Sequence, residues 1–299
     1  MTDLPRLDTP RLPAGTSDRK LLVIGVDGLR WDRIAPSPAP VLHDLIAGGL
    51  YGTGAHPFDS PARTMSGPGW STMLTGVSPA RHGVLSNSFR GRRFDRYPDF
   101  LTLAKRARPE LSVYAAVDWP ALTDKGLFGP DIDVRVTLDG ERNTYAAEDP
   151  RIADVSVRVL AERDPDVAFV YLCSIDEAGH KEGALSDLYR DRIARVDAMI
   201  GRLLSAVRGR PRYAEEHWLV LVSTDHGHLD TGGHGGTSEA ERAVFVILYG
   251  DGVPAGARLP AFRTVDVAPT ALAHLAIPLD PAWEFEGRAL LDPAGGPAA

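Results

Sequence analysis

The stretch Leu21-Leu-Val-Ile-Gly-Val-Asp27 joins a short, uninterrupted apolar run to a carboxylate. A β-branched run of this length is typical of a strand buried on both faces of a parallel sheet. Comparable runs occur at residues 112–117, 167–173, 218–222 and 243–248. Amphipathic helical patterns separate them, at residues 41–47, 100–106, 153–162 and 185–207. Strands that alternate with helices predict an α/β fold, a three-layer α/β/α domain around a central, mostly parallel sheet.

The length of the chain allows one large α/β domain or two small ones, at 299 residues. No internal repeat and no low-complexity linker divides it, so we expect a single domain over residues 19–292. Residues 1–18 are rich in proline and polar side chains and predict a flexible N-terminal arm. Residues 293–299 are rich in proline, glycine and alanine and predict a frayed tail.

Charge and cysteine content exclude several classes of protein. The net charge of −7 argues against a nucleic-acid polymer as partner, because such proteins present a basic surface. The single cysteine, Cys173, forms no internal disulfide, and its apolar surroundings predict a core position. No stretch approaches the roughly 20 apolar residues of a membrane span, and the N-terminus lacks a signal-peptide pattern. We therefore expect a cytoplasmic protein without a membrane partner, and its oligomeric state stays open.

Three carboxylates follow three of the predicted strands, namely Asp27, Asp176 and Asp225. In open α/β sheets, ligands bind outside the carboxyl ends of the strands. We therefore expect these side chains to meet at one edge of the sheet. His226 follows Asp225 directly, and His180 lies four residues after Asp176. Aspartate and histidine are the ligands that a metal-dependent hydrolase needs, so the sequence predicts a metal site.

Two further histidines lie close to these groups in the sequence. His234 has two glycines on each side, which would let its imidazole reach a metal. His228 could be a spare ligand or a hydrogen-bonding group behind the ligands, and we expect it not to bind the metal directly. The remaining histidines lack such company and are interpreted as structural; they are His43, His56, His82, His217 and His274.

A hydroxyl-bearing loop precedes a predicted helix. It reads Arg63-Thr-Met-Ser-Gly-Pro-Gly-Trp70. The N-terminus of a helix favours an anion, and a metal beside Ser66 would lower the pKa of its hydroxyl and make it a nucleophile. The alternative is a plain serine that caps the helix. The loop alone favours that alternative.

Four segments in this order resemble the alkaline phosphatase superfamily, and within it the type I phosphodiesterase/nucleotide pyrophosphatase branch. They are residues 22–29, residues 66–84, Asp176-x-x-Gly-His180 and Ser223-Thr-Asp-His-Gly227. Residues 265–278 are similar to the helix that follows the core in this superfamily. Each motif is weak alone, but their order and spacing form a specific signature that covers nearly the whole chain.

The resemblance implies two divalent metal ions, with zinc as the expected metal. Around the first ion it places Asp27, Ser66, Asp225 and His226. Around the second ion it places Asp176, His180 and His234. The position of His234 departs from the nucleotide pyrophosphatases, in which the last ligand comes much later in the chain. It matches members that are similar to phosphoethanolamine transferases.

The resemblance also implies the reaction. Ser66 takes the place of the threonine nucleophile and would attack phosphorus in line, forming a covalent phosphoseryl intermediate. Asn87 and the backbone N–H of Gly67 would donate to the phosphate oxygens. The expected substrate is a small phosphorylated molecule with a phosphodiester or pyrophosphate bond.

Three other functions remain open. A phosphomonoesterase needs a cation for the additional phosphate charge, and Arg63 or Arg90 could supply it unless the arginine-rich run 90–96 is a solvated loop. A sulfatase would need an arginine where Trp70 stands. A catalytically silent binding protein would usually have lost a ligand or the nucleophile, and none is lost here. The aromatic residues Phe89, Phe94 and Trp119 could stack on a base or pack a lid.

Overall fold

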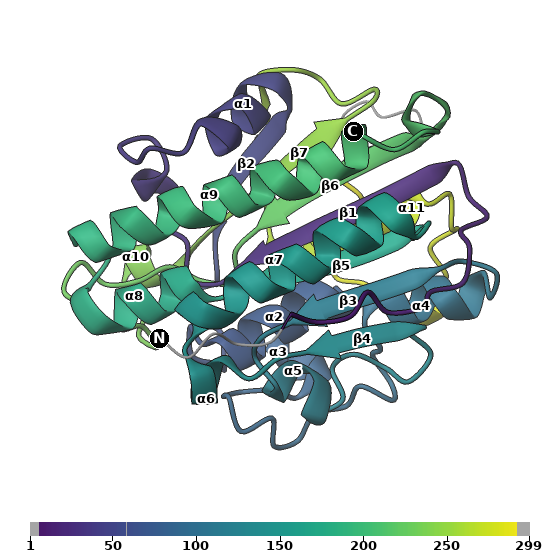
Figure 1. Ribbon diagram of the computed structural model, residues 1–299. Coiled ribbons are helices and arrows are strands. Elements are labelled where there is room, and N and C mark those ends of the chain that lie inside the picture. The colour runs from purple at the N-terminus through teal and green to yellow at the C-terminus, as the bar shows by residue number, and fades with distance from the viewer. Residues whose placement is uncertain (1–5, 58, 292–299) are drawn as a thin grey trace.

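The computed structural model describes residues 6–57 and 59–291 and contains an eight-stranded sheet (Figure 1). The strand order is β4-β3-β5-β1-β6-β7-β2-β8. The strands are β1 (Arg19–Val26), β2 (Leu50–Ala55), β3 (Val113–Val117), β4 (Val134–Thr137), β5 (Val167–Leu172), β6 (His217–Ser223), β7 (Ala243–Gly250) and β8 (Ala257–Arg258). Strand β7 runs antiparallel to both its neighbours, and the other neighbouring strands are parallel. The predicted α/β fold with a mostly parallel sheet is confirmed.

Helices cover both faces of the sheet, as Figure 1 shows. One face carries α1 (Pro40–Gly48), α7 (Tyr145–Glu162), α8 (Ser174–Glu182) and α9 (Asp187–Arg208). The other carries α2 (Ser66–Thr75), α4 (Phe100–Ala107) and α11 (Val267–His274). Short helices lie in the connections, namely α3 (Pro79–His82), α5 (Ala121–Asp124), α6 (Gly140–Asn143) and α10 (Glu239–Arg242). Within the described chain, no helix has both the length and the apolar character to cross a membrane.

Strand β1 lies in the interior of the sheet, and both of its faces are apolar. Its side chains alternate between two hydrophobic cores, with Leu22 and Ile24 in one and Leu21 and Val23 in the other. All four are fully buried. Parallel pairing with β5 on one side and β6 on the other brings the ends of three strands together. The residues that follow these ends therefore share one edge of the sheet.

The sequence patterns missed the strands at the margins of the sheet. Strand β2 contains Gly52 and Gly54, and β4 is only partly buried, so neither shows a continuous apolar run. Helix α7 begins at Tyr145, earlier than the predicted residue 153, and continues through Pro150. Proline lacks a backbone N–H and usually interrupts a helix. The helical pattern was therefore predicted to begin only after Pro150.

Residues 6–18 have no regular secondary structure but are attached to the domain. The backbone N–H groups of Thr16 and Ser17 donate to the carboxylate of Asp166, at 3.1 and 3.0 Å. Arg158 on α7 donates to the carbonyl of Leu7 and the hydroxyl of Thr9. The described part of the predicted flexible arm is thus hydrogen-bonded along its length, and the predicted tail 293–299 lies outside the described residues.

Asp166→Ala should lower the free energy of unfolding by about 3 kcal/mol or more. The substitution leaves the buried Lys20 ammonium, whose Nζ lies 2.8 Å from Asp166 Oδ1, with only the partly exposed Asp164 as a carboxylate partner. Urea denaturation followed by circular dichroism measures the loss. Asp154→Ala, which removes an exposed ion pair with Arg202, is the matched control and should cost no more than about 1 kcal/mol. Equal losses in the two variants would contradict the role of Asp166.

Candidate metal centre

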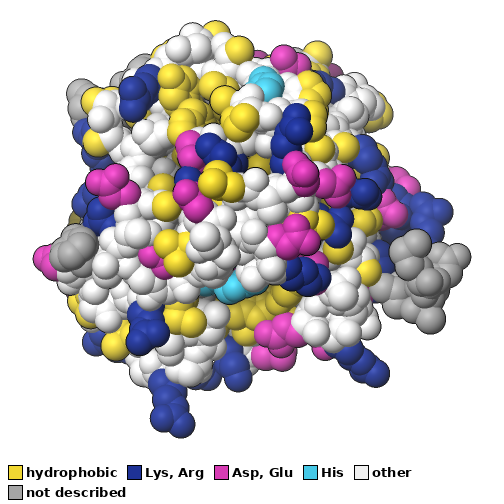
Figure 2. Space-filling view, turned by 90° about the vertical axis from the view of Figure 1, so that its left-hand side faces the viewer, with side chains coloured by type: hydrophobic (Ala, Val, Ile, Leu, Met, Phe, Trp, Pro, Cys, Tyr) yellow, Lys and Arg dark blue, Asp and Glu magenta, His cyan; other side chains and the backbone are white. Residues whose placement is uncertain are grey.

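The three carboxylates meet at the carboxyl edge of the sheet. Asp27 follows β1 directly, Asp225 lies just beyond β6, and Asp176 is in the first turn of α8, directly after β5. Figure 2 views the molecule from this side, where a histidine lies in a hollow of the surface. One possible ligand group contains Asp27, Asp176 and His226, with ligand atoms within 4.8 Å of one another. A second contains Asp176, His180, His228 and His234.

The first group surrounds the hydroxyl of Ser66. Ser66 Oγ lies 3.5 Å from Asp27 Oδ1 and 3.3 Å from His226 Nε2. His226 Nε2 also lies 3.4 Å from Asp27 Oδ1 and 3.3 Å from Asp225 Oδ2. The other imidazole nitrogen, Nδ1, donates to the carbonyl of Gly227 at 3.0 Å, so the lone pair of Nε2 faces the carboxylates. Asp225 Oδ2 is buried and has no hydrogen-bond partner among the described residues.

The second group lies across Asp176 from the first. His180 Nε2 is 3.5 Å from Asp176 Oδ2, and His234 Nε2 is 3.5 Å from Asp176 Oδ1. The two imidazole Nε2 atoms are 2.9 Å apart. His234 Nδ1 donates to the carbonyl of Thr64 at 2.7 Å, which directs its Nε2 lone pair toward this group.

Burial and mutual repulsion shift the pKa values of these carboxyl groups. Burial, followed by the charge of Asp176, raises the pKa of Asp27 to about 7. Burial, followed by the charges of Asp27 and Asp176, raises the pKa of Asp225 well above its usual value. Burial would also raise the pKa of Asp176, but the hydrogen bond from His228 and the neighbouring imidazoles lower it. Carboxyl groups held this close either keep a proton or need a positive charge nearby in order to ionise together.

Two donors fix Asp27 so that one oxygen is left for a cation. Tyr171 donates its hydroxyl to Asp27 Oδ2 at 2.5 Å, and Trp70 donates its indole N–H to the same oxygen at 2.8 Å. Asp27 Oδ1 therefore faces Ser66 and His226. Carboxylate oxygens with free imidazole nitrogens are the donor set that divalent zinc prefers. The residues present fit a divalent metal.

Helix α2 presents Ser66 and reaches the site through a glycine. Ser66 is the first residue of α2, and Met65, not Ser66, holds the N-cap position. A side chain at Gly69 would place its Cβ 2.9 Å from the Cβ and the carbonyl oxygen of Asp225. Glycine at this position therefore lets the helix pack directly against the residue that follows β6. The interpretation of Ser66 as a simple helix cap does not hold in this geometry.

The roles expected of Gly67 and Asn87 need one correction. The Gly67 N–H donates to Asn87 Oδ1 at 2.8 Å, so it is not directed at a phosphate oxygen. This bond engages the carbonyl oxygen of the Asn87 side chain and leaves its amide nitrogen without a described hydrogen bond. The Gly67 N–H therefore orients Asn87.

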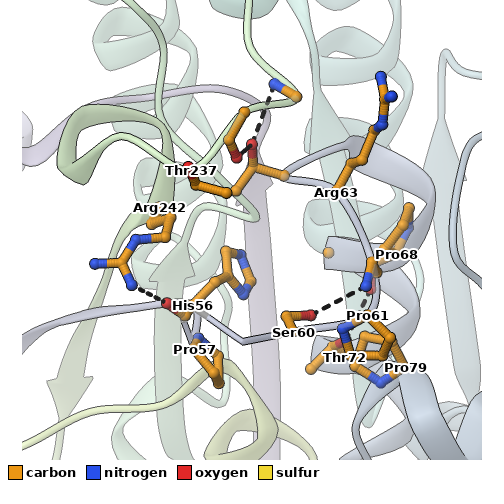
Figure 3. Close-up of a pocket in the computed structure, with 15 residues that line it drawn as sticks. His56, Pro57, Ser60, Pro61, Arg63, Pro68, Thr72, Pro79, Thr237 and Arg242 are labelled. Atoms are coloured by element: carbon orange, nitrogen blue, oxygen red, sulfur yellow. Dashed lines mark hydrogen bonds between the residues drawn. The ribbon is translucent and has the colours of Figure 1, made fainter.

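The candidate substrate arginines lie outside both ligand groups. Arg63 and Arg90 are exposed. Arg63 lines a cavity beside α2, and Figure 3 shows its side chain directed away from His56 and Ser60. None of the predicted metal ligands lines this cavity. The Nε2 atom of His56 hydrogen-bonds the backbone carbonyl of Asp225. This contact fits the structural role predicted for His56.

The remaining candidates are part of the scaffold. Arg93 and Arg96 bind the backbone carbonyls of Ala80 and Ala282, so half of the arginine run is engaged in the fold. The aromatic residues pack on one another, with ring centroids 5.9 Å apart for Phe89 and Trp119 and 6.4 Å for Phe89 and Phe94. Phe89 and Trp119 are buried, so they do not offer a free face to a base. The buried position predicted for Cys173 is also observed.

One residue that supports the site was not predicted. Asp149 on α7 accepts hydrogen bonds from the backbone N–H groups of Cys173 and Ser174, at 2.8 and 3.0 Å, and so holds the turn that presents Asp176. No sequence motif links it to that turn. His228, which the sequence left open as a spare ligand or as a hydrogen-bonding group behind the ligands, lies within the second group and is fully buried.

A family model described as type I phosphodiesterase/nucleotide pyrophosphatase matches residues 21–237. The chain belongs to this family. The resemblance to the alkaline phosphatase superfamily is thereby confirmed, and the family is one of metal-dependent hydrolases.

Curated relatives of the chain are distant and longer. Human GPI ethanolamine phosphate transferase 2, catalytic subunit, is 23% identical over 87% of this chain and 26% of its own length. Mouse ectonucleotide pyrophosphatase/phosphodiesterase family member 7 is 24% identical over 70% of this chain and 49% of its own length. The chain therefore spans half or less of these relatives.

Solved structures share the fold. Murine ectonucleotide pyrophosphatase/phosphodiesterase 5 has a TM-score of 0.65 at 15% identity, covering 87% of this chain and 95% of that one. A 2-O GAG sulfatase has a TM-score of 0.71 at 13% identity, covering 91% and 73%. At such identities the likeness establishes an alkaline phosphatase-like fold and leaves the reaction to the residues of the site.

Zinc added to chelator-treated protein should raise the thermal midpoint more at pH 8 than at pH 6. At pH 6 the metal must displace the proton that Asp27 holds with its pKa of about 7. Without metal, this raised pKa makes stability fall as the pH rises from about 4 to about 7, because the unfolded chain releases its proton first. With free zinc at about 100 times its Kd, the gain is about 2.7 kcal/mol. Scanning calorimetry measures the thermal midpoint with and without zinc. Equal zinc-induced shifts at pH 6 and pH 8 would contradict the raised pKa of Asp27.

Proposed function

We propose that the chain hydrolyses phosphodiester or pyrophosphate bonds, with two divalent metal ions and Ser66 as the nucleophile. The observation that carries this proposal is the position of Ser66 Oγ, within 3.5 Å of both Asp27 Oδ1 and His226 Nε2. A second ligand group faces it across Asp176. Zinc is the metal that the mixed carboxylate and imidazole donors favour.

The side chains divide between the two ions as follows. Asp27, Asp225 and His226 would hold the ion beside Ser66. Asp176, His180 and His234 would hold the other. When bound, the two ions supply positive charge that lowers the pKa of the Ser66 hydroxyl and neutralises the phosphate oxygens.

The chain's own residues then carry a two-step displacement. Ser66 releases its hydroxyl proton to solvent, and its Oγ forms a bond to phosphorus while the bond to the leaving-group oxygen breaks on the opposite side; the leaving oxygen takes up a proton from solvent. The amide nitrogen of Asn87 donates to a non-bridging oxygen as charge builds on it. The N-terminus of α2, which begins at Ser66, adds a favourable dipole for the anion. Water then attacks the phosphoserine, and the phosphorus–Oγ bond breaks to restore Ser66.

A diester or pyrophosphate is favoured over a monoester, because the family model that matches the chain describes phosphodiesterases and nucleotide pyrophosphatases. Arg63 and Arg90, the candidate partners for the additional charge of a monoester, lie outside both ligand groups. A sulfatase is also disfavoured. At the position where a sulfatase motif needs arginine, Trp70 is buried and donates to Asp27.

Nucleotide-like diesters are the first natural substrates to consider. An inactive variant of the murine structural neighbour is described in complex with AMP. The net charge of −7 favours a small phosphorylated molecule over a nucleic-acid polymer. The exposed imidazole of His180 marks the side from which such a molecule would enter.

Ser66→Ala should reduce turnover at least 1,000-fold while leaving bound zinc unchanged, because it removes the nucleophile but no carboxylate or imidazole ligand. Ser66→Thr keeps a hydroxyl and serves as the matched variant that should retain activity. Steady-state rates and elemental analysis of the same preparations test both. Full activity in Ser66→Ala would move the nucleophile elsewhere, with Thr64 the nearest candidate.

The zinc-loaded protein should hydrolyse bis-p-nitrophenyl phosphate faster than p-nitrophenyl phosphate. The comparison of kcat/KM for the two esters tests the diester assignment directly. A faster rate on the monoester would make the protein a phosphatase and would call for substitution of Arg63 and Arg90. Turnover of p-nitrophenyl sulfate above both would reassign it as a sulfatase.

A further inference from the structure

His228 makes the shortest contact that Asp176 has with another side chain. Its Nε2 lies 2.7 Å from Asp176 Oδ1, and the imidazole is fully buried. The rings of three other histidines stand around it, with centroids 4.9–5.8 Å away for His180, His226 and His234. The mechanism above gives this residue no task.

The contact between His228 Nε2 and Asp176 Oδ1 is a hydrogen bond, because the two atoms are too close to be ligands of one metal ion. Ligand atoms about 2.0–2.1 Å from a tetrahedral zinc lie roughly 3.3 Å apart. The 3.5 Å between His180 Nε2 and Asp176 Oδ2 fits that spacing, but the 2.7 Å between His228 Nε2 and Asp176 Oδ1 does not. The 2.9 Å between His180 Nε2 and His234 Nε2 is also shorter than that spacing, so these two imidazoles would have to move apart to share an ion. A contact this short between an oxygen and a nitrogen needs a proton between them. An ionised carboxylate only accepts, so the proton is on His228 Nε2.

The backbone and two glycines hold the imidazole in this position. A Cβ at Gly28 would lie 2.8 Å from His228 Nε2, and a Cβ at Gly179 would lie 2.7 Å from its ring. Arg30, itself almost buried, donates to the carbonyl of His228 at 3.1 Å. His228 Nδ1 is buried and has no partner among the described residues. The ring is therefore fixed from both sides with only Nε2 engaged.

We propose that His228 is a positioning residue that donates its Nε2–H to Asp176 Oδ1 and thereby sets the affinity of the second metal site. This inference rests on the two-metal function proposed above. With Oδ1 held by His228, Asp176 Oδ2 is the oxygen that faces His180 and would bind the ion. Partners of this kind orient a ligand carboxylate, and their loss weakens metal binding.

Three substitutions in the full-length chain test the proposal. His228→Leu removes the donor, whereas His228→Gln keeps an amide N–H close to the position of Nε2. Gly179→Ala changes no ligand side chain but crowds the ring, because the added Cβ would lie 2.7 Å from it. His43→Gln is the matched control, because His43 Nε2 hydrogen-bonds the carbonyl of Ile34 and belongs to neither ligand group. Circular dichroism first confirms that each variant is folded.

Calorimetric titration of zinc into the metal-free variants provides the readout. We expect His228→Leu and Gly179→Ala to weaken the second zinc about 10–100-fold and to leave the first unchanged. His228→Gln should recover most of the loss, and His43→Gln should match the wild type. Unchanged zinc affinity in His228→Leu would overturn the proposal. X-ray absorption that counts fewer imidazole ligands per zinc in both His228 variants would also overturn it, because His228 would then be a direct ligand.

Hydrolysis of bis-p-nitrophenyl phosphate, measured on the same samples, separates this inference from the proposed function. Wild type that binds two zinc ions but cleaves no ester would refute the function and leave the His228 result standing. Active wild type with unaltered binding in His228→Leu would refute only the inference. Wild type that binds fewer than two ions would overturn both.

Discussion

The structure depends on the burial of three carboxylates at one edge of its sheet. Asp27, Asp176 and Asp225 are almost completely removed from water, and each follows a strand or begins a helix that the core fixes in place. Two unit charges 4 Å apart repel by about 4 kcal/mol at an effective dielectric constant of 20. This repulsion is concentrated at one place in the fold, and a cation bound there would offset it.

The rigidity of the scaffold follows from the same arrangement. Strand β1 lies between β5 and β6 and is buried on both faces. The three carboxylates that follow these strands are therefore held in fixed positions relative to one another. Donors from Tyr171 and Trp70 hold Asp27, and Asp149 holds the turn before Asp176. Ligands that are already oriented lose little conformational freedom when a metal binds, which is why preorganised sites bind tightly.

The fold alone does not choose the reaction. Phosphodiesterases and sulfatases occur among structures with TM-scores of 0.65 and 0.71 to this chain. The choice lies in a few side chains around the nucleophile. Here Trp70 supports Asp27 from within the core, and Asn87 lies beside the start of α2. These neighbours suit a phosphate ester whose charge is met by metal ions and an amide.

The sequence by itself determined the α/β class, the five interior strands and the residues at their ends, because buried parallel strands are continuous apolar runs and ligands gather at their carboxyl ends. It did not reveal β2, β4 and β8, whose patterns are weakened by glycine or partial exposure. Only the tertiary structure showed that the Gly67 N–H serves Asn87 and that His228 and Asp149 support Asp176. Those contacts join segments that are distant in the chain, and their distances depend on how helices pack against the sheet, which no local pattern encodes.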